Sequence, residues 1–407
     1  MKVKLSEISR VWPIAKRRTA SAIASWAQRL LAGEKLVRDV FGKGRSKRVL
    51  MCHLPEAFNS KPLSKYHSNL TECYTIARCF DRLGYSVDCC SRGKTGIDYS
   101  PYDVVFGING NAFMGSFDVS GKQPLRIFYS VGAEMCYNYK VTALRNREFF
   151  ERHGLWLLNS NRYMPGDGRA YYETTFSDAV VMLGSEYVLE QYLKQDDRKE
   201  KYALLPAFYF KVTEPEREKD FAKCNKSILW FGSSGMVHKG LDIAIDFVMA
   251  HKEYTLHVCG GSRLESGFWD YYNPKVKECG NIIMHGFVDI ESKEFARILS
   301  ECGILASPSI SEGMAVAVLN VIGNGALLPV YSAATGIDFG RHGIMVADVT
   351  YAAFEEALSQ AGSMPVEELA LKAWAAHKLI RENYTIEQYE QRMFSHLKTI
   401  LENKDKI

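Results

Sequence analysis

The chain alternates between patterns typical of β-strands and patterns typical of α-helices. In its first part, a helical stretch at Ser68–Leu83 lies among short apolar runs, which include Arg48–His53, Tyr85–Cys89 and Val104–Ile108. Alternation of this kind favours a mainly parallel sheet with helices on both of its faces. The segment 207–226, which follows Pro206 and contains Pro215 and the charged run Glu214–Asp220, then breaks the pattern and indicates a linker.

The same alternation resumes after the linker. The strands and helices expected in this second part are Ser227–Phe231, Leu241–Ala250, Thr255–Cys259, Asn281–Gly286 and Ser292–Ser300. A chain of 407 residues is long enough for two ordinary domains. We therefore predict an α/β protein with two Rossmann-like, doubly wound domains, at 48–212 and 213–374, and a C-terminal helix at 375–407. Because ligands of such sheets bind beyond the carboxyl ends of the strands, we expect the active site in a cleft that the two domains face.

The composition is that of a soluble globular protein, with 47% apolar and 24% charged residues. No apolar run reaches the roughly 18 residues of a membrane-spanning helix, and the N-terminus lacks the uninterrupted apolar core of a signal peptide. The ten cysteines form no Cys-x-x-Cys pair. Most of them lie in apolar segments, which is typical of free thiols in a reducing compartment. We expect a cytoplasmic protein.

A basic arm, residues 1–47, precedes the first strand. Residues 1–48 contain thirteen Lys or Arg and three acidic residues, a net charge of +10, so the rest carries −6 of the total of +4. Within 8–41, apolar residues recur every three or four positions from Ile23 to Leu30, as on one face of a helix. Such a basic amphipathic helix can lie on an anionic membrane surface. The alternatives are a helix packed on its own domain and a poorly ordered tail. Nucleic-acid binding is the weakest interpretation, because no stacking aromatics lie among cations later in the chain.

Two segments of the second part carry patterns suited to phosphate. A turn rich in glycine and serine, Gly232–Gly240, follows a strand and leads into a helix, and its amides together with Lys239 can hold a diphosphate. In residues 307–330, a strand leads through a Ser/Pro loop to Glu312 and Gly313, which we expect to open a helix. A helix N-terminus favours an anion through its free amides and its dipole. The other interpretation of Glu312 is a carboxylate that this dipole stabilises.

Four motifs of the second part occur in a fixed order: Lys239-Gly240, Gly260-Gly261, His285-Gly286-Phe287-Val288 and Ser311-Glu312-Gly313. In this order the chain resembles the retaining glycosyltransferases of family 4, among them the bacterial polysaccharide glycosyltransferases of group 1. The resemblance implies the GT-B architecture, in which two Rossmann-like domains face a cleft and the C-terminal helix crosses back to the N-terminal domain.

The resemblance implies roles for two charged side chains and shows two departures. Glu312 would hold hydroxyls of the donor sugar and balance charge at the anomeric centre, and Lys239 would neutralise the leaving nucleotide diphosphate. Where the family has an Arg in the turn, this chain has Ser233, and we expect backbone amides or His238 to supply part of the missing donation. Where the family has a second Glu, spaced Glu-x7-Glu, this chain has Asn320. The side-chain oxygen of Asn320 can still accept one hydrogen bond from a ribose hydroxyl.

The other implied donor contacts come mainly from the backbone. A glycine after the strand Thr255–Cys259 lets the backbone pass close to the ligand. The end of the strand Asn281–Gly286 contacts the nucleotide base, and amides after Glu312 bind the phosphates. The residues concerned are Ser234, Gly260, Phe287, Val288, Gly313, Met314 and Ala315.

In the first part of the chain, His67 and Asn69 stand where the first helix begins. A subset of the family carries a similar His-x-Asn-x-x-Glu there and lacks the second Glu, so Asn320 fits that subset. The resemblance implies that His67 orients or deprotonates an acceptor hydroxyl, a role for which histidine is a common residue type, and that Asn69 and Gly132 lie on the acceptor side. His67 and Asn69 can equally be structural groups of a helix N-terminus.

The sequence therefore predicts a hexosyltransferase-type enzyme that moves a sugar from a nucleotide diphosphate sugar to a hydroxyl of a lipid-linked or growing cell-surface polysaccharide. Because no Asp-x-Asp follows a strand and no cluster has metal-ligand spacing, we expect transfer without a metal or other cofactor. The enzyme would be peripheral on the inner face of the cell membrane and serve the cell envelope. The alternatives are a non-catalytic GT-B scaffold that binds nucleotide sugar, which the residues Ser233 and Asn320 keep open, and a nucleotide-sugar 2-epimerase.

Overall fold

The computed structural model describes residues 35–58, 67–160, 162, 169–215, 219–261 and 265–404. The chain divides into two units, Met1–Ile127 and Phe128–Ile407. Both units are built from largely parallel strands and helices, which confirms the predicted α/β class with two parallel, Rossmann-like sheets. The domain limits that we derived from the sequence stay a prediction.

Among its described residues, the first unit holds four strands and the start of a fifth. They are β1 (Leu36–Val37), β2 (Arg48–His53), β3 (Ser86–Ser91), β4 (Val104–Gly107) and β5 (Leu125–Ser130), in the order β1-β3-β2-β4-β5. Strand β2 runs parallel to β3 and β4, and β1 runs antiparallel to β3. The α-helices that the structure describes in this unit are α2 (Ser68–Arg82) and α3 (Asn111–Met114), and the single turns η1 (Pro55–Phe58) and η2 (Gly115–Phe117) accompany them.

Part of the predicted arm belongs to this unit. Leu36 and Val37 pair with Cys90 and Cys89 of β3, and Lys35 pairs with Glu56 at 3.5 Å. Residues 1–34, which include the predicted amphipathic helix, lie outside the described residues. Within the predicted arm, residues 36–37 therefore form a strand of the sheet in the first unit.

The second unit continues the strand order of β5 with β6 (Ala179–Leu183) and β7 (Tyr202–Leu205) and adds a six-stranded parallel sheet. That sheet consists of β8 (Ser227–Gly232), β9 (Thr255–Gly260), β10 (Ile282–Gly286), β11 (Ile304–Ser307), β12 (Leu328–Ser332) and β13 (Ile344–Val346). Its order is β10-β9-β8-β11-β12-β13.

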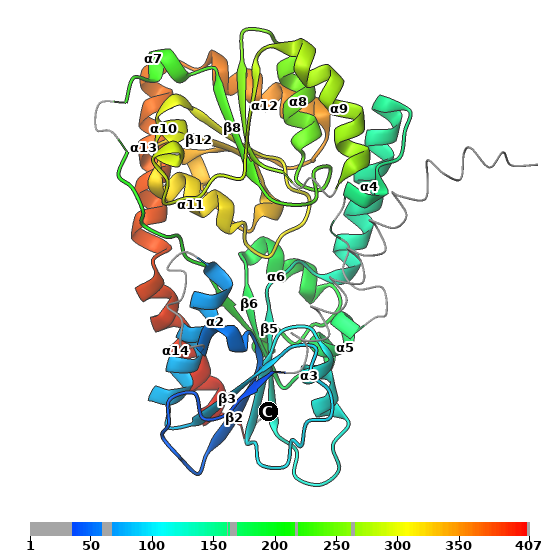
Figure 1. The fold of residues 1–407 in the computed structure, drawn as a ribbon, viewed down its shortest axis with the longest axis vertical. Helices are drawn as coiled ribbons and strands as arrows, with labels where there is room; N and C mark the ends of the chain where they lie inside the picture. Colours follow the sequence, from blue (N-terminus) through cyan, green and yellow to red (C-terminus); the bar gives the residue numbers. More distant parts are fainter. Residues whose placement is uncertain are drawn as a thin grey trace, which may run out of the picture. The chain divides into compact units, whose positions relative to one another are not determined.

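Helices cover both faces of the six-stranded sheet (Figure 1). Helices α8 and α12 pack together on one side, and α11 and α13 pack together on the other. The helices of the second unit are α4 (Met135–His153), α5 (Arg169–Phe176), α6 (Glu186–Leu193), α7 (Phe221–Cys224), α8 (Leu241–Ala250), α9 (Ser266–Cys279), α10 (Lys293–Glu301), α11 (Val316–Asn324), α12 (Tyr351–Ser363), α13 (Val366–Asn383) and α14 (Ile386–Glu402).

The core of this sheet also fixes the turn that follows β8. Trp230 is 2% exposed and packs in the core with residues such as Phe247 and Ile304. Its indole N–H donates to the carbonyl oxygen of Lys239 at 3.0 Å. Because a buried indole N–H needs an acceptor, this bond ties the backbone of the turn to the core.

The C-terminal stretch is helical as predicted, but it is two helices rather than one. Helix α13 ends at Asn383, and the side chain of Thr385 accepts from the amide of Gln388 at 3.3 Å and so starts α14. Helix α14 packs against β7. Its Tyr389 hydroxyl lies 2.9 Å from that of Tyr129 in β5.

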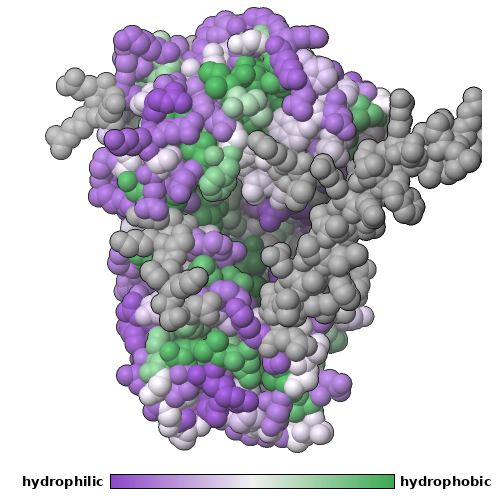
Figure 2. Space-filling model, in the orientation of Figure 1, coloured by the Kyte–Doolittle hydropathy of each residue, from purple (hydrophilic) through white to green (hydrophobic). Residues whose placement is uncertain are grey.

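Among the described residues, no helix is both long enough and apolar enough to cross a membrane. Hydrophilic residues cover much of the face in Figure 2, and hydrophobic residues show through in separate patches between them.

Candidate active site

The six-stranded sheet has one point where its strand order reverses. From β8 the chain proceeds to β9 and β10 on one side, and from β11 it proceeds to β12 and β13 on the other, while β8 and β11 lie side by side. In parallel sheets of this kind, ligands bind at such a point, beyond the carboxyl ends of the strands. Two loops start there, residues 233–240 after β8 and residues 308–315 after β11.

These loops bring Lys239 and Glu312 together, although 72 positions separate them in the printed sequence. Lys239 Nζ lies 3.2 Å from Glu312 Oε1, and the hydroxyl of Ser309 donates to the same oxygen at 3.0 Å. Arg162 Nη1 lies 3.3 Å from Glu312 Oε2. Burial alone would raise the pKa of Glu312, but the charges of Lys239 and Arg162 outweigh it and lower the pKa to about 2. Glu312 is therefore a carboxylate across the physiological pH range.

Gly313 sits where the backbone is tightly packed. A Cβ at this position would lie 2.7 Å from the carbonyl oxygen of Val131 and 3.0 Å from the amide nitrogen of Gly132. On the other side, a Cβ at Gly336 would lie 2.0 Å from the carbonyl oxygen of Gly313. The structure thus brings Gly132, which we predicted on the acceptor side, into contact with Gly313 of the donor motif.

Helix α11 starts later than predicted. Glu312 and Gly313 lie in the loop, and the helix begins at Val316. The Ala315 amide, which we expected to reach a phosphate, donates to the carbonyl of Thr335 at 2.8 Å. Within the part of the chain that the structure describes, the amides of Gly313 and Met314 have no hydrogen-bond partner. These two amides remain available to an anion.

The turn after β8 has less free donor capacity than its sequence indicates. Ser233 and Ser234 are exposed, but the amides of Gly235 and Met236 donate to the carboxylate of Glu265, at 2.6 and 2.9 Å. These two amides are therefore not the donors that we expected to compensate for the missing Arg.

His238 does not supply a cation either. It is buried, and burial lowers its pKa to about 4, so the ring is neutral at physiological pH. Its Nε2 lies 2.8 Å from the carbonyl oxygen of Ser311. Because a carbonyl only accepts, Nε2 carries the proton. The ring holds the two loops together.

The ends of β9 and β10 contain the other predicted donor contacts. Gly260 has a φ of +86°, and a Cβ there would lie 1.8 Å from the carbonyl oxygen of Gly232, so only glycine fits this position. After β10, Phe287 is 88% exposed, whereas Val288 is buried. An exposed aromatic ring at the end of β10 is available to stack on a planar base.

Asn320 and Asn324 of α11 serve the backbone of the linker. The side-chain oxygen of Asn320 accepts from the amide of Phe210 at 2.8 Å, and that of Asn324 accepts from the amide of Val212 at 2.9 Å. The Asn320 oxygen keeps one acceptor direction, so its contact with a ribose stays a prediction.

His67 and Asn69 belong to the first unit. His67 is the N-cap of α2, and its Nδ1 accepts from the amide of Leu70 at 3.4 Å. Asn69 is exposed in the first turn. His67 thus caps the helix, as its structural interpretation states. Its role toward an acceptor stays a prediction.

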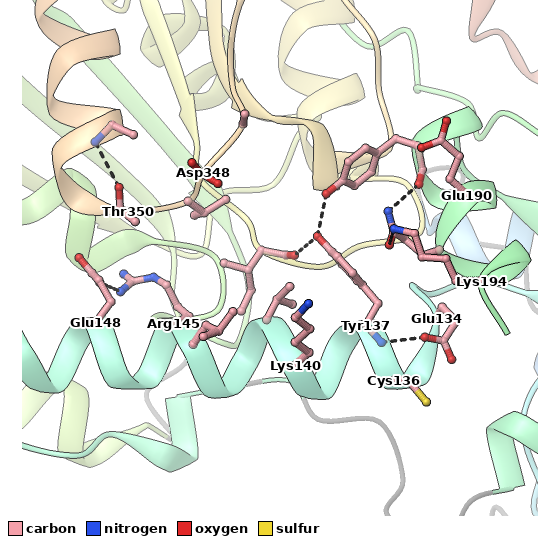
Figure 3. Close-up of a pocket in the computed structure, with 18 of the residues that line it drawn as sticks. Glu134, Cys136, Tyr137, Lys140, Arg145, Glu148, Glu190, Lys194, Asp348 and Thr350 are labelled. Carbon is pink, nitrogen blue, oxygen red and sulfur yellow. Dashed lines mark hydrogen bonds and ion pairs between the residues drawn. The ribbon is translucent and has the colours of Figure 1, made fainter.

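A separate cavity of about 950 Å³ lies beside the loop that carries Glu312 (Figure 3). Ile310 of that loop lines it, and the hydroxyl of Tyr137 donates to the Ile310 carbonyl at 3.2 Å. The charged residues lining the cavity are Glu134, Glu148, Glu190, Asp348 and Glu356 against Lys140, Arg145 and Lys194. This negative balance disfavours an anionic ligand such as a diphosphate and suits a neutral one that is rich in hydroxyl groups.

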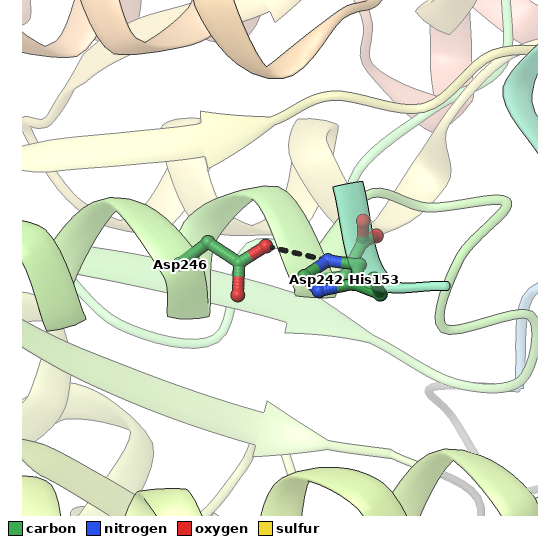
Figure 4. Close-up of side chains that lie close together, drawn as sticks. All are labelled: His153, Asp242 and Asp246. Atoms are coloured by element: carbon green, nitrogen blue, oxygen red, sulfur yellow. Dashed lines mark ion pairs between the residues drawn. The ribbon is translucent and has the colours of Figure 1, made fainter. Parts of the chain in front are cut away.

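Three side chains with metal-ligand chemistry cluster at α4 and α8, namely His153, Asp242 and Asp246 (Figure 4). His153 Nε2 lies 3.0 Å from Asp246 Oδ2. Arg152 pairs with both carboxylates, and Arg145 pairs with Asp242. Because these guanidinium groups already neutralise the carboxylates, the cluster suits an ion-pair network between the two helices better than a metal site.

Arg162 and Glu265 were missed by the sequence analysis. Neither lies in a recognisable motif, and each acts on a loop that is far from it in the sequence. Only the fold brings Arg162 to Glu312.

Residues 225–363 match the family model of glycosyl transferases group 1. This segment contains both loops of the site. No curated protein sequence matches the chain.

The fold resembles solved structures of low sequence identity. Sucrose-phosphate synthase from Thermosynechococcus elongatus has a TM-score of 0.60 at 12% identity, over 88% of this chain and 99% of that chain. HepE from Anabaena, solved with UDP and glucose, has a TM-score of 0.57 at 11% identity, over 87% and 99% of the two chains. TarM from S. aureus has a TM-score of 0.48 at 14% identity over 72% of this chain, which spans only 54% of the TarM chain. The first two likenesses show the GT-B fold, and the group 1 match supports a glycosyltransferase.

Proposed function

We propose that this protein, with its group 1 segment and GT-B fold, is a retaining, metal-independent glycosyltransferase of the family 4 type. It transfers a hexosyl group from a nucleotide diphosphate sugar to a hydroxyl of a glycan. The observation that carries this proposal is the meeting of Lys239 and Glu312 at the strand-order reversal, inside the segment that matches the family.

The charges of the site fit this reaction. Glu312 stays ionised, so it cannot act as a general acid, and it serves instead to accept hydrogen bonds from donor-sugar hydroxyls and to stabilise positive charge at the anomeric carbon. The bond between that carbon and the diphosphate oxygen breaks, and the electron pair leaves with the diphosphate. Lys239 and the amides of Gly313 and Met314 stabilise the negative charge that develops there. The acceptor oxygen forms the new bond and gives up its proton, for which His67 is the proposed base.

The acceptor is a glycan, and the cavity of Figure 3 has the size and charge for it. Pockets for small ligands measure roughly 300–1,000 Å³, so about 950 Å³ is enough for several sugar rings. We further propose a lipid-linked or cell-surface glycan and a peripheral position on the cytoplasmic side of a membrane, because residues 8–41 are basic and amphipathic. Most of that segment lies outside the described residues. Sedimentation of the full chain with anionic and neutral vesicles tests this, and equal binding to both would contradict it.

The test of the activity is a screen of purified protein against UDP-, GDP- and ADP-sugars, with and without neutral oligosaccharides. We expect Glu312→Gln to lower kcat by about 100- to 1,000-fold and Lys239→Ala to lower kcat/KM. Arg147→Ala is the matched control, since Arg147 pairs with Glu151 on the exposed face of α4. Unchanged rates in both site variants would overturn the assignment, and an inverted anomeric configuration in the product would overturn retention.

One observation favours a second candidate, a nucleotide-sugar-binding scaffold without turnover. The side-chain oxygen of Asn320 is already engaged by the amide of Phe210, which weakens its use as a ribose ligand. Nucleotide binding without transfer or hydrolysis of any donor in the same screen would favour the scaffold.

A further inference from the structure

The turn after β8 contributes one cation to the donor site. All residues of Gly232–Gly240 are described, and Lys239 is the only charged one among them at neutral pH, because His238 is neutral and buried. The amides of Gly235 and Met236 are bound by the carboxylate of Glu265. A diphosphate is usually bound by more than one cation, or by one cation and several amides. The turn alone therefore has too few positive charges and free N–H groups to bind a diphosphate.

A second cation reaches the same place from elsewhere in the second unit. Arg162 Nη1 lies 3.3 Å from Glu312 Oε2, while Lys239 Nζ lies 3.2 Å from Glu312 Oε1. The aliphatic part of Arg162 runs across the turn, because a Cβ at Gly235 would lie 2.8 Å from its Cγ and 3.1 Å from its Cδ. Glycine at 235 leaves the room that this side chain occupies.

The backbone of Arg162 is held by the same side chain that holds the Glu312 loop. Asn138 of α4 is buried, and its Nδ2 donates to the carbonyl of Arg162 at 3.2 Å and to the hydroxyl of Ser311 at 3.0 Å. A buried amide with two such partners fixes the spacing between the two segments. The position of Arg162 beside Glu312 thus follows from the packing of α4 and not only from the exposed ion pair.

The charges leave the cluster ready for an anion. Two cations share one carboxylate, so one positive charge is in excess. The Arg162 side chain is 48% exposed and the Lys239 side chain is 16% exposed, so ligand oxygens can reach the guanidinium from solvent. A guanidinium binds phosphate oxygens in a bidentate manner, which an ammonium cannot do.

We propose that Arg162 is the second cation of the donor site and binds the diphosphate of the nucleotide sugar together with Lys239. It fills from outside the turn the role that Ser233 cannot fill from within it. This inference rests on the proposed function. Both cations pair with Glu312 in this structure, and each has further N–H groups that can contact the diphosphate while the cation stays beside the carboxylate.

The experiment measures the dissociation constants of UDP, GDP and ADP by calorimetry, for the wild-type chain and a set of variants. For the diphosphate that binds, we expect Arg162→Ala to raise Kd by about 10- to 100-fold, as for the loss of a charge-assisted hydrogen bond. Arg162→Lys keeps the charge but loses the bidentate guanidinium, so its Kd should lie between those of Arg162→Ala and the wild type. Arg147→Ala removes an exposed arginine of α4 and should leave Kd unchanged.

A rescue makes the test more specific. Adding Ser233→Arg to the Arg162→Ala chain places a guanidinium in the turn itself. We expect the Kd of this double variant to be at least fivefold lower than the Kd of Arg162→Ala. If no diphosphate binds the wild type, the proposed function fails. If the wild type binds, Lys239→Ala weakens binding and Arg162→Ala binds as well as the wild type, this inference alone fails. An equal loss in Arg147→Ala would also overturn it, because the effect would then be one of net charge. Absence of rescue would contradict the equivalence of the two positions.

Discussion

Two carboxylates of the second unit are each held by two cations, and they differ in their access to solvent. Asp242 in α8 pairs with two arginines of α4, and its side chain is fully buried. Glu312, in the loop after β11, pairs with Lys239 and Arg162, and 12% of its side chain is exposed. Asp242 has no surface left for a ligand, whereas Glu312 and its cations have.

The difference shows that charge clustering alone does not identify a functional site. Asp242 lies three positions after Lys239, at the start of the helix that follows the glycine-rich turn, so its place in the sequence is as prominent as that of Lys239. Its environment makes it a structural residue that fastens α4 to α8. A buried charge pair stabilises chiefly because either partner alone would be an unpaired buried charge, while an accessible pair can exchange its partner for a ligand.

The largest expected effect comes from breaking the buried cluster. We expect Asp242→Asn to lower the free energy of unfolding by about 3 kcal/mol, because the side chain of Arg145, which is 1% exposed, loses its fully buried partner and keeps only Glu148. Chemical denaturation followed by circular dichroism measures this. The control is Glu151→Gln, which removes an exposed ion pair from the same helix and should cost less than about 1 kcal/mol. Equal midpoints for the two variants would contradict the structural role of Asp242.

Much of the fold follows from local pattern. The limits of β2 and α8 agree residue for residue with the strand and the helix expected at Arg48–His53 and Leu241–Ala250. Each of these segments is apolar enough to be buried in one sheet or helix layer, so its period and length are set locally. The start of α11 was predicted too early, because the loop before it is fixed by bonds to distant residues such as Thr335, which no local pattern reveals.

The candidate site divides in the same way. The motifs around Lys239 and Glu312 could be predicted because each is a strand followed directly by a turn and a helix start. The parallel sheet then brings the two motifs side by side. Arg162 was not readable, since its position depends on the amide of Asn138 in α4, a helix that the sequence analysis did not predict. Likewise, the binding of two turn amides by Glu265 is a long-range contact without a sequence signal.

A smaller effect on nucleotide binding is expected at the end of β10, where one residue is exposed and the next is buried. Phe287 is 88% exposed while Val288 is 5% exposed, so we expect Phe287→Ala to leave the melting temperature unchanged and to weaken nucleotide binding about tenfold, as for the loss of one stacked base. Calorimetry with the nucleotide that binds the wild type measures this. Leu371→Ala, which truncates another exposed apolar side chain (71%) on α13, is the control. A Phe287→Ala variant that binds as tightly as the control would remove Phe287 from the donor site.

The smallest effect is a dependence on pH that belongs to the accessible cluster. The pKa of Glu312 is lowered from 4.5 to about 2, because Lys239 and Arg162 outweigh its burial. A lowered carboxylate pKa stabilises the fold fully above pH 4.5, and this contribution is lost as the pH falls from 4.5 toward 2. The wild type should therefore be more stable than Glu312→Gln at pH 7 and at pH 5, and the gap should close progressively below pH 4.5. His238, whose lowered pKa of about 4 destabilises the fold as the pH drops below 6.5, is present in both proteins. Because the charge of Glu312 raises the pKa of His238, the gap reports Glu312 together with this neighbour. Melting temperatures of both proteins between pH 7 and pH 3.5 give the measurement.

A gap in melting temperature that stayed constant over this range would mean that the two cations do not hold Glu312 in its ionised form. The accessible cluster would then lose the charge balance on which its proposed chemistry depends.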